Sequence, residues 1–83
     1  MKATLKLYAS LTDFLPPGTR GNIAEIDVGE DESVAAITER FHLPQKMVHL
    51  VLVNGVFVKP EDRPSRTLDP GDALAIWPPV AGG

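Results

Sequence analysis

The residues best suited to chemistry in this sequence lie at its C-terminal end. The run Pro78-Pro79-Val80-Ala81-Gly82-Gly83 carries no charged side chain and ends on two glycines. Prolines favour a stiff, extended backbone and cannot continue the hydrogen-bonded ladder of a sheet. Fully extended, six residues reach about 20 Å. Because glycine has no Cβ, the Gly83 carboxylate can enter a narrow tunnel and meet another molecule's backbone closely. We therefore predict a carboxylate that reacts inside a partner.

Side-chain chemistry elsewhere has weaker support. The chain contains no cysteine, which excludes thiolate metal sites and cysteine nucleophiles. His42 and His49 have no carboxylates around them at a spacing typical of metal ligands. No serine lies in a Gly-x-Ser-x-Gly elbow. Glu61 and Asp62 are adjacent carboxylates, but a charged loop offers no desolvated cleft to raise a pKa. We expect no metal and no cofactor bound by this chain.

Composition narrows the classes of function further. Eighty-three residues, 43% hydrophobic and 23% charged, indicate one globular domain. A net charge of -3 without clustered Lys and Arg argues against nucleic acid as a partner. The glycines stand singly at turns and form no phosphate-binding loop. No apolar run approaches the ~20 residues that span a bilayer, and the first residues do not resemble a signal peptide. We expect a cytoplasmic protein without a membrane partner.

Two alternating segments in the first third of the chain predict strands. In residues 2–8, apolar Ala3, Leu5 and Leu7 alternate with polar neighbours, which is typical of a half-buried strand. Residues 23–28 repeat the pattern, with Ala24, Ile26 and Val28 facing inward. The segment between them supplies the apolar anchors Leu11, Phe14 and Leu15 and then a loop rich in proline and glycine.

One amphipathic helix is predicted after the second strand. Asp31 or Ser33 can cap it, and the acidic run 30–32 favours the positive end of the helix dipole. Apolar residues at positions 34, 37 and 41 form a stripe of helical period that packs onto a sheet. The helix cannot pass Pro44, where a short helical turn begins.

The second half of the chain is predicted to hold three more strands. Asn54-Gly55 is typical of a type I′ hairpin, since both residues tolerate a positive φ. It joins a strand at 49–53 to one at 56–58. Residues 59–66 form a surface connection, Leu68 packs into the core, and a turn at 70–72 leads into the last strand at 73–77.

This order of elements predicts an α+β fold. One helix with one apolar stripe needs one sheet face, so we expect a single mixed sheet curled over one main helix. A right-handed crossover places the first and last strands side by side in the middle. This architecture is the ubiquitin-like β-grasp. We assign residues 1–77 to that domain and residues 78–83 to a flexible, extended tail.

The sequence resembles the MoaD/ThiS group of ubiquitin-like sulfur carriers in prokaryotes. The residues that carry the resemblance are Asn54-Gly55, Pro70-Gly71-Asp72, Ala75-Ile76-Trp77-Pro78-Pro79-Val80 and Ala81-Gly82-Gly83. It is most similar to the MoaD-like branch, the small subunit of molybdopterin synthase. Members of this group are not catalytic alone. Their terminal carboxylate is adenylated by an E1-like adenylyltransferase of the MoeB/ThiF type, which uses ATP and magnesium, and is then converted to a thiocarboxylate with sulfur from a donor.

For this chain the resemblance implies roles for the tail. Gly83 would hold the sulfur and Gly82 would provide clearance. Pro78, Pro79, Val80 and Ala81 would occupy the tunnel of a MoaE-like large subunit or of another sulfur acceptor. The destination implied is molybdopterin synthesis, although Thr12 stands where MoaD-like sequences often carry an arginine.

Other functions stay open at this point. The same carrier chemistry serves thiamine, cysteine, a tungsten cofactor, tRNA thiolation or conjugation to protein lysines. A passive β-grasp binding module is a further alternative, and it predicts that loss of Gly82 and Gly83 is harmless. Candidates for a partner surface are Phe57, Trp77, Arg63 and Arg66. The alternative is that the two aromatic residues pack in the core and the two arginines are merely solvated.

Overall fold

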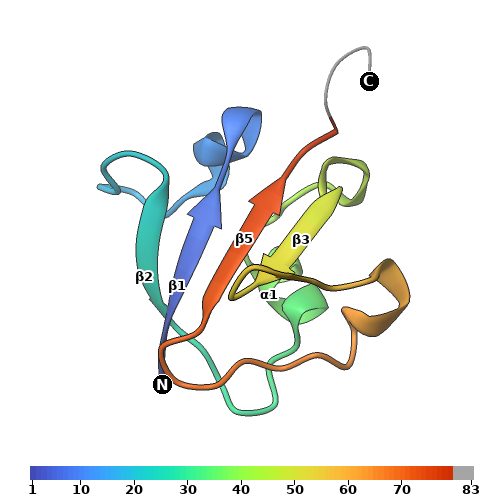
Figure 1. Cartoon of the computed structure of the whole chain (residues 1–83). Coiled ribbons are helices and arrows are strands. Elements are labelled where there is room, and N and C mark those ends of the chain that lie inside the picture. The colour runs from blue at the N-terminus through green and yellow to red at the C-terminus, as the bar shows by residue number, and fades with distance from the viewer. Residues whose placement is uncertain (80–83) are drawn as a thin grey trace.

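The computed structural model describes residues 1–79 (Figure 1). Its strands and helix are β1 (Lys2–Leu7), β2 (Ile23–Asp27), α1 (Val34–Arg40), β3 (Leu50–Val53), β4 (Val56–Phe57) and β5 (Ala73–Trp77). Three short 3₁₀ helices complete it: η1 (Ala9–Phe14), η2 (Gln45–Met47) and η3 (Pro60–Asp62). The strands and α1 match the predicted elements to within one or two residues at most ends, but neither η1 nor η3 was predicted.

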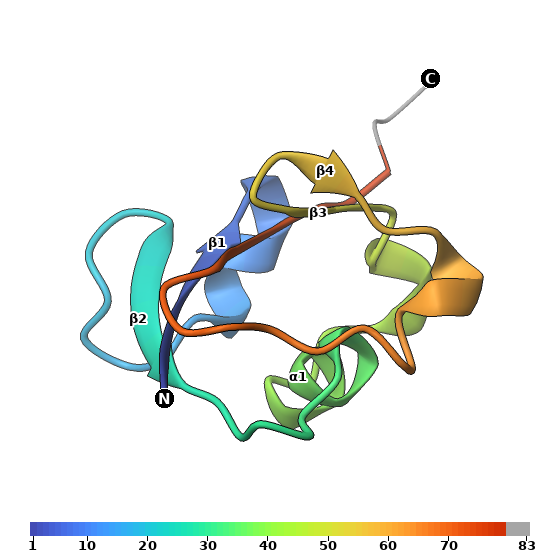
Figure 2. The same cartoon turned by 60° about the horizontal axis from the view of Figure 1, so that its bottom comes forward.

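The strands form one mixed sheet in the order β2-β1-β5-β3-β4. The central strands β1 and β5 run parallel, with Leu5 opposite Leu74, and every other neighbouring pair is antiparallel. Figures 1 and 2 show α1 on one side of this sheet. The predicted β-grasp architecture, with the first and last strands side by side in the middle, is confirmed.

The core lies between the sheet and the helix. Alternate residues of β1, β3 and β5 are buried on the helix side, and Val34 and Ile37 of α1 are fully buried against them. Ile26 and Val28 are also buried, as predicted, and Leu68 closes the core from the connection before β5. Leu11 of η1 is completely inaccessible, because a single 3₁₀ segment folds it back beneath the sheet.

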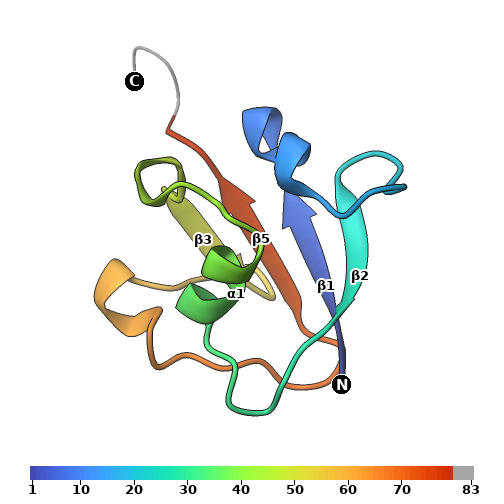
Figure 3. The same cartoon turned by 180° about the vertical axis from the view of Figure 1, so that it is seen from behind.

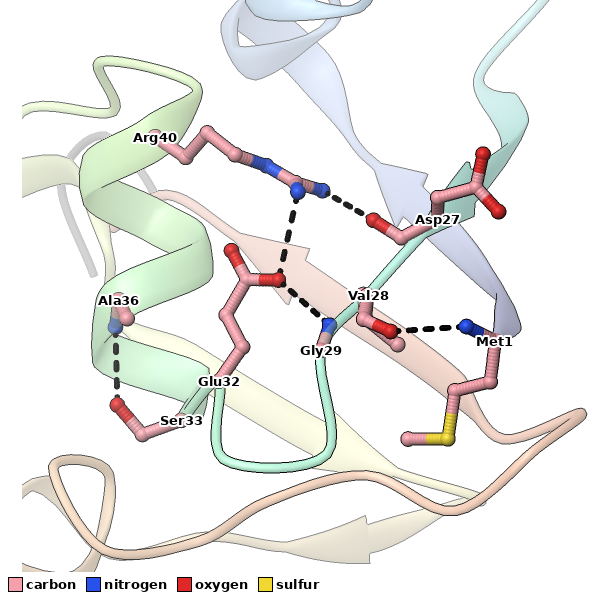
Figure 4. Close-up of polar contacts among 8 residues, drawn as sticks. All are labelled: Met1, Asp27, Val28, Gly29, Glu32, Ser33, Ala36 and Arg40. Carbon is pink, nitrogen blue, oxygen red and sulfur yellow. Dashed lines mark hydrogen bonds and ion pairs between the residues drawn. The ribbon is translucent and has the colours of Figure 1, made fainter.

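Ser33 begins the helix, which decides between the two predicted caps. Its Oγ accepts a hydrogen bond from the backbone N–H of Ala36 at 3.1 Å (Figure 4). Glu32 reaches back to accept from the Gly29 N–H at 3.1 Å and also pairs with Arg40 at 3.3 Å. The other nitrogen of the Arg40 guanidinium donates to the Asp27 carbonyl at 2.9 Å, so the helix is tied to the end of β2.

The helix ends in a Schellman motif. The N–H of His42 donates to the Glu39 carbonyl at 2.9 Å, and the N–H of Leu43 donates to the Thr38 carbonyl at 3.0 Å. His42 takes a φ of 61°, a left-handed conformation that glycine usually supplies at this position. The chain therefore leaves the helix before Pro44, as predicted.

The β3–β4 hairpin is anchored to the start of β5. Asn54 and Gly55 have φ values of 51° and 82°, which confirms the predicted turn. The Asn54 side chain donates to Asp72 at 2.8 Å and accepts from the N–H of Ala73 at 2.9 Å. Asp72 also accepts from the N–H of Asp69 at 2.8 Å. That backbone bond, and then the Asn54 amide, lower the pKa of Asp72.

Candidate functional site

The site begins where β5 leaves the sheet. The Ile76 carbonyl accepts from the N–H of Tyr8 at 3.2 Å, and the Trp77 carbonyl accepts from the N–H of His49 at 3.1 Å. Pro78 and Pro79 follow and lack the N–H that would continue the ladder. Figure 1 shows this exit at the end of the molecule opposite the N-terminus. The predicted reactive and tunnel residues Val80, Ala81, Gly82 and Gly83 lie outside the described residues.

Trp77 is held at the exit by an aromatic partner. Its ring lies parallel to that of Tyr8, with the centroids 4.1 Å apart and the planes 7° from parallel. Both side chains are half-buried, so Trp77 is partly accessible as well as packed. The stack joins β1 to β5 just before the tail begins, and it orients the last strand residue.

An apolar patch covers the outer face of the sheet beside the exit. The register places Leu50 opposite Trp77, and Leu52 opposite both Ala75 and Phe57. These side chains point away from α1, because their neighbours Val51 and Val53 are buried on the helix side. Phe57 is 50% exposed and Leu50 37% exposed. We call Tyr8, Leu50, Leu52, Phe57 and Trp77 the outer patch.

Phe57 was a candidate for a partner surface. Its exposure shows that the alternative of a core position is wrong, and its contact with a partner stays a prediction. Leu50 and Leu52 were not proposed from the sequence. The continuous apolar run of β3 hides which alternate residues face outward, and only the pairing with β5 separates them.

A cleft of about 620 Å³ lies at the exit, and Trp77, Pro78 and Pro79 form part of its lining. The other lining residues are Ala9 and Ser10 of η1 with Lys46 and Met47 of η2. Figure 3 shows these two segments, blue and yellow-green, on either side of the exit. Most of the lining is hydrocarbon, and Lys46 is its one charged residue among those described. We call it the exit cleft.

Arg63 is buried and does not belong to a partner surface, which corrects the sequence-based proposal. Its guanidinium donates to the carbonyls of Val58, Val48 and His49 at 3.1, 3.2 and 3.1 Å. Burial lowers the pKa of Arg63, and the negative charge of Glu61 opposes that shift. The side chain connects η3 to the start of β3 through these hydrogen bonds. The sequence of the charged loop 59–66 did not indicate this role.

The other proposed residues have simpler positions. Arg66 is exposed, and its guanidinium donates to the neighbouring carbonyl of Thr67. His42 and His49 are exposed as well. Within residues 1–79, no group of three His, Cys, Asp or Glu side chains could hold a metal ion. None of the described helices is long and apolar enough to cross a membrane.

Comparison with known proteins gives the family. The family model described as Mut7-C ubiquitin matches residues 1–82. The chain belongs to the Mut7-C ubiquitin family. No curated protein sequence matches this family member significantly. The family match confirms that the chain is ubiquitin-like, as the resemblance to the ubiquitin-like sulfur carriers implied.

Solved structures from Haloferax volcanii are similar over 95% or more of the Mut7-C ubiquitin chain. The crystal structure of SAMP1 has 25% identity and a TM-score of 0.69, and each chain is covered completely. The solution structure of the HVO 2177 protein has 26% identity and a TM-score of 0.73, covering all of this chain and 87% of that one. A crystal structure of small archaeal modifier protein 1 has 23% identity and a TM-score of 0.65, covering 95% and 98%. The fold is that of a ubiquitin-like small archaeal modifier.

Proposed function

We propose that this Mut7-C ubiquitin family member is a sulfur carrier that acts through the carboxylate of Gly83. The observation that supports the proposal is the exit of β5. A central strand of the sheet ends at Trp77, which belongs to both the outer patch and the exit cleft, and two prolines direct the chain away from the ladder. These features support a role of the following residues in contact with a partner.

The proposed chemistry has two steps, the first at the α-phosphorus of ATP and the second at the carboxyl carbon of Gly83. A carboxylate oxygen of Gly83 attacks the α-phosphorus of ATP, pyrophosphate leaves, and an acyl adenylate forms. Hydrosulfide released by a donor then attacks the acyl carbon, AMP leaves with the bonding electron pair, and the sulfur loses its proton. The product is a thiocarboxylate. The first step is required because a free carboxylate is a poor acyl donor, whereas AMP is a good leaving group.

The partners follow from this chemistry. An E1-like adenylyltransferase of the MoeB/ThiF type would supply ATP, magnesium and the catalytic side chains. The outer patch is the surface that we propose for its first contact, because Trp and Tyr are enriched among the few residues that carry most of the binding energy at protein interfaces, and the patch contains one of each. The acceptor that we propose is a MoaE-like large subunit, which would place the chain in molybdopterin synthesis in the cytoplasm.

Intact mass spectrometry tests the proposal directly. The chain is incubated with ATP, magnesium, a sulfur donor and the host's E1-like enzyme, beside a variant that lacks Gly83. We expect a mass gain equal to the exchange of one oxygen for sulfur, located in the C-terminal peptide and absent from the variant. An unchanged mass, with an enzyme shown to be active on another carrier, would contradict the proposal. The same outcome would favour the passive binding module.

Conjugation to other proteins is a second candidate, which the likeness to small archaeal modifier protein 1 favours. It uses the same acyl adenylate, but the amine of a target lysine attacks the acyl carbon and loses a proton as AMP leaves. An epitope-tagged chain expressed in its host would then appear in bands of higher mass on denaturing gels. Those bands should disappear when Gly83 is deleted. Their absence, together with a thiocarboxylate, would leave sulfur transfer as the function.

A further inference from the structure

We propose that the exit cleft is a docking site for a segment of the adenylating enzyme that presents a bulky apolar side chain beside a carboxylate. The inference rests on the proposed function and adds a second contact to it. The exit cleft adjoins the outer patch at Trp77 and is further lined by residues of η1 and η2. The enzyme would therefore contact both the outer patch and the cleft beside it.

The cleft has the size and lining of a binding site. Its volume of about 620 Å³ lies within the range of about 300–1,000 Å³ that is typical of sites for small ligands. Ala9, Met47, Trp77, Pro78 and Pro79 contribute mainly carbon. An apolar side chain that entered the cleft would leave water and gain contacts with all of them.

The walls of the cleft are held in place before any partner arrives. On one side, Ala9 takes a φ of 54°, and the N–H of Leu11 donates to the Tyr8 carbonyl at 3.1 Å. On the other side, the N–H of Met47 donates to the Pro44 carbonyl at 2.9 Å. The Arg63 guanidinium holds the carbonyl of Val48, which follows Met47 directly. A preformed cleft spares the partner the entropy cost of ordering it.

Charge defines the chemistry of the occupant. Lys46 is exposed, and no ion pair involves it among the described residues. No acidic side chain is among the lining residues. An occupant with a carboxylate near its apolar group would pair with the Lys46 ammonium, and one with a cation would be repelled.

Reach allows an enzyme that acts on Gly83 to supply the segment. Pro79 lies in the lining of the cleft, and only four residues separate it from the reactive carboxylate, a distance of at most about 14 Å. A small domain is about 30 Å across. An active site that surrounds Gly83 therefore brings the surface of its own domain against the mouth of the cleft.

The test measures ATP–pyrophosphate exchange by the host's E1-like enzyme while the concentration of the carrier is varied. Lys46→Glu reverses the charge of the cleft, and Ser10→Phe fills it from an exposed position. Lys59→Glu is the matched control, because Lys59 is also an exposed lysine beside a 3₁₀ helix but does not line the cleft. We expect Lys46→Glu and Ser10→Phe to raise the half-saturating concentration about tenfold and Lys59→Glu to leave it unchanged.

A salt titration separates charge pairing from a structural effect. Added sodium chloride should weaken wild type and Lys59→Glu more than Lys46→Glu, since screening removes an attraction that Lys46→Glu has already lost. Circular dichroism of each variant confirms the fold.

The outcomes distinguish the two proposals. If wild type supports exchange and both cleft variants have the same half-saturating concentration as Lys59→Glu, the docking site is overturned. The carrier function then still stands. No exchange with wild type would overturn both. A dimer that Ser10→Phe abolishes in sedimentation would reassign the cleft to a second copy of the chain and overturn the proposal.

Discussion

Replacement of the buried Arg63 by alanine should destabilise the protein strongly. The side chain donates three hydrogen bonds to backbone carbonyls in two segments of the chain: Val48 and His49 directly before β3, and Val58 directly after β4. The Arg63 backbone carbonyl also accepts from the N–H of Ala35 at 3.0 Å, in the first turn of α1. The residue thus connects the helix, the start of β3 and η3.

The magnitude follows from these bonds and from the cost of burial. A hydrogen bond from a charged donor contributes about 1.5–3 kcal/mol net. Three such bonds do not add fully, because the buried guanidinium also loses hydration. Water can enter the space that alanine leaves and bind some of the carbonyls. We therefore expect the free energy of unfolding to fall by about 3 kcal/mol, or Tm by about 12–24 °C.

Urea denaturation followed by the fluorescence of Trp77 measures this loss. Trp77 is the one tryptophan of the chain and reports on the sheet through its stack on Tyr8. Arg66→Ala is the matched control, since it removes an exposed arginine three residues away and should change stability by less than about 0.5 kcal/mol. A fall in the free energy of unfolding of less than about 1 kcal/mol for Arg63→Ala would show that these hydrogen bonds do not stabilise the fold strongly.

Three further predictions follow from other parts of the structure. The Asp69 N–H and the Asn54 amide lower the pKa of Asp72 in the folded state. The ionised carboxylate therefore stabilises the fold at pH values above its unfolded pKa of about 3.9. This stability is lost as the pH falls through the lower folded pKa. In urea titrations between neutral pH and the acid transition, Asp72→Asn should make the free energy of unfolding depend less on pH. An unchanged dependence on pH would contradict the role of Asp72. His42→Gly should raise the free energy of unfolding by about 0.5–1 kcal/mol, because glycine adopts the left-handed φ of 61° without strain; a lower Tm would show that the His42 side chain compensates for it. Phe57→Ser should leave Tm nearly unchanged but lower the rate of thiocarboxylate formation at subsaturating carrier about fivefold or more, and an equal rate would remove Phe57 from the enzyme contact.

Local patterns were sufficient to predict most of the fold. The alternation in residues 2–8, the helical stripe of Val34 and Ile37, and the turn at Asn54-Gly55 depend only on neighbours in the chain. In the structure, the apolar residues of the strand and of the helix are buried, and the two turn residues have positive φ values. The order of these elements then left few ways to bury one helix on one sheet.

Three features of the candidate site could not be predicted in this way. The sequence alone indicated the proline exit and the diglycine end, because those residue types restrict the backbone wherever they occur. Tertiary structure alone decided that Arg63 is buried and that Leu50 and Leu52 face outward beside Trp77. It also brought η1 and η2 together around the exit. These outcomes depend on strand register and on contacts between residues far apart in the chain, which no local pattern encodes.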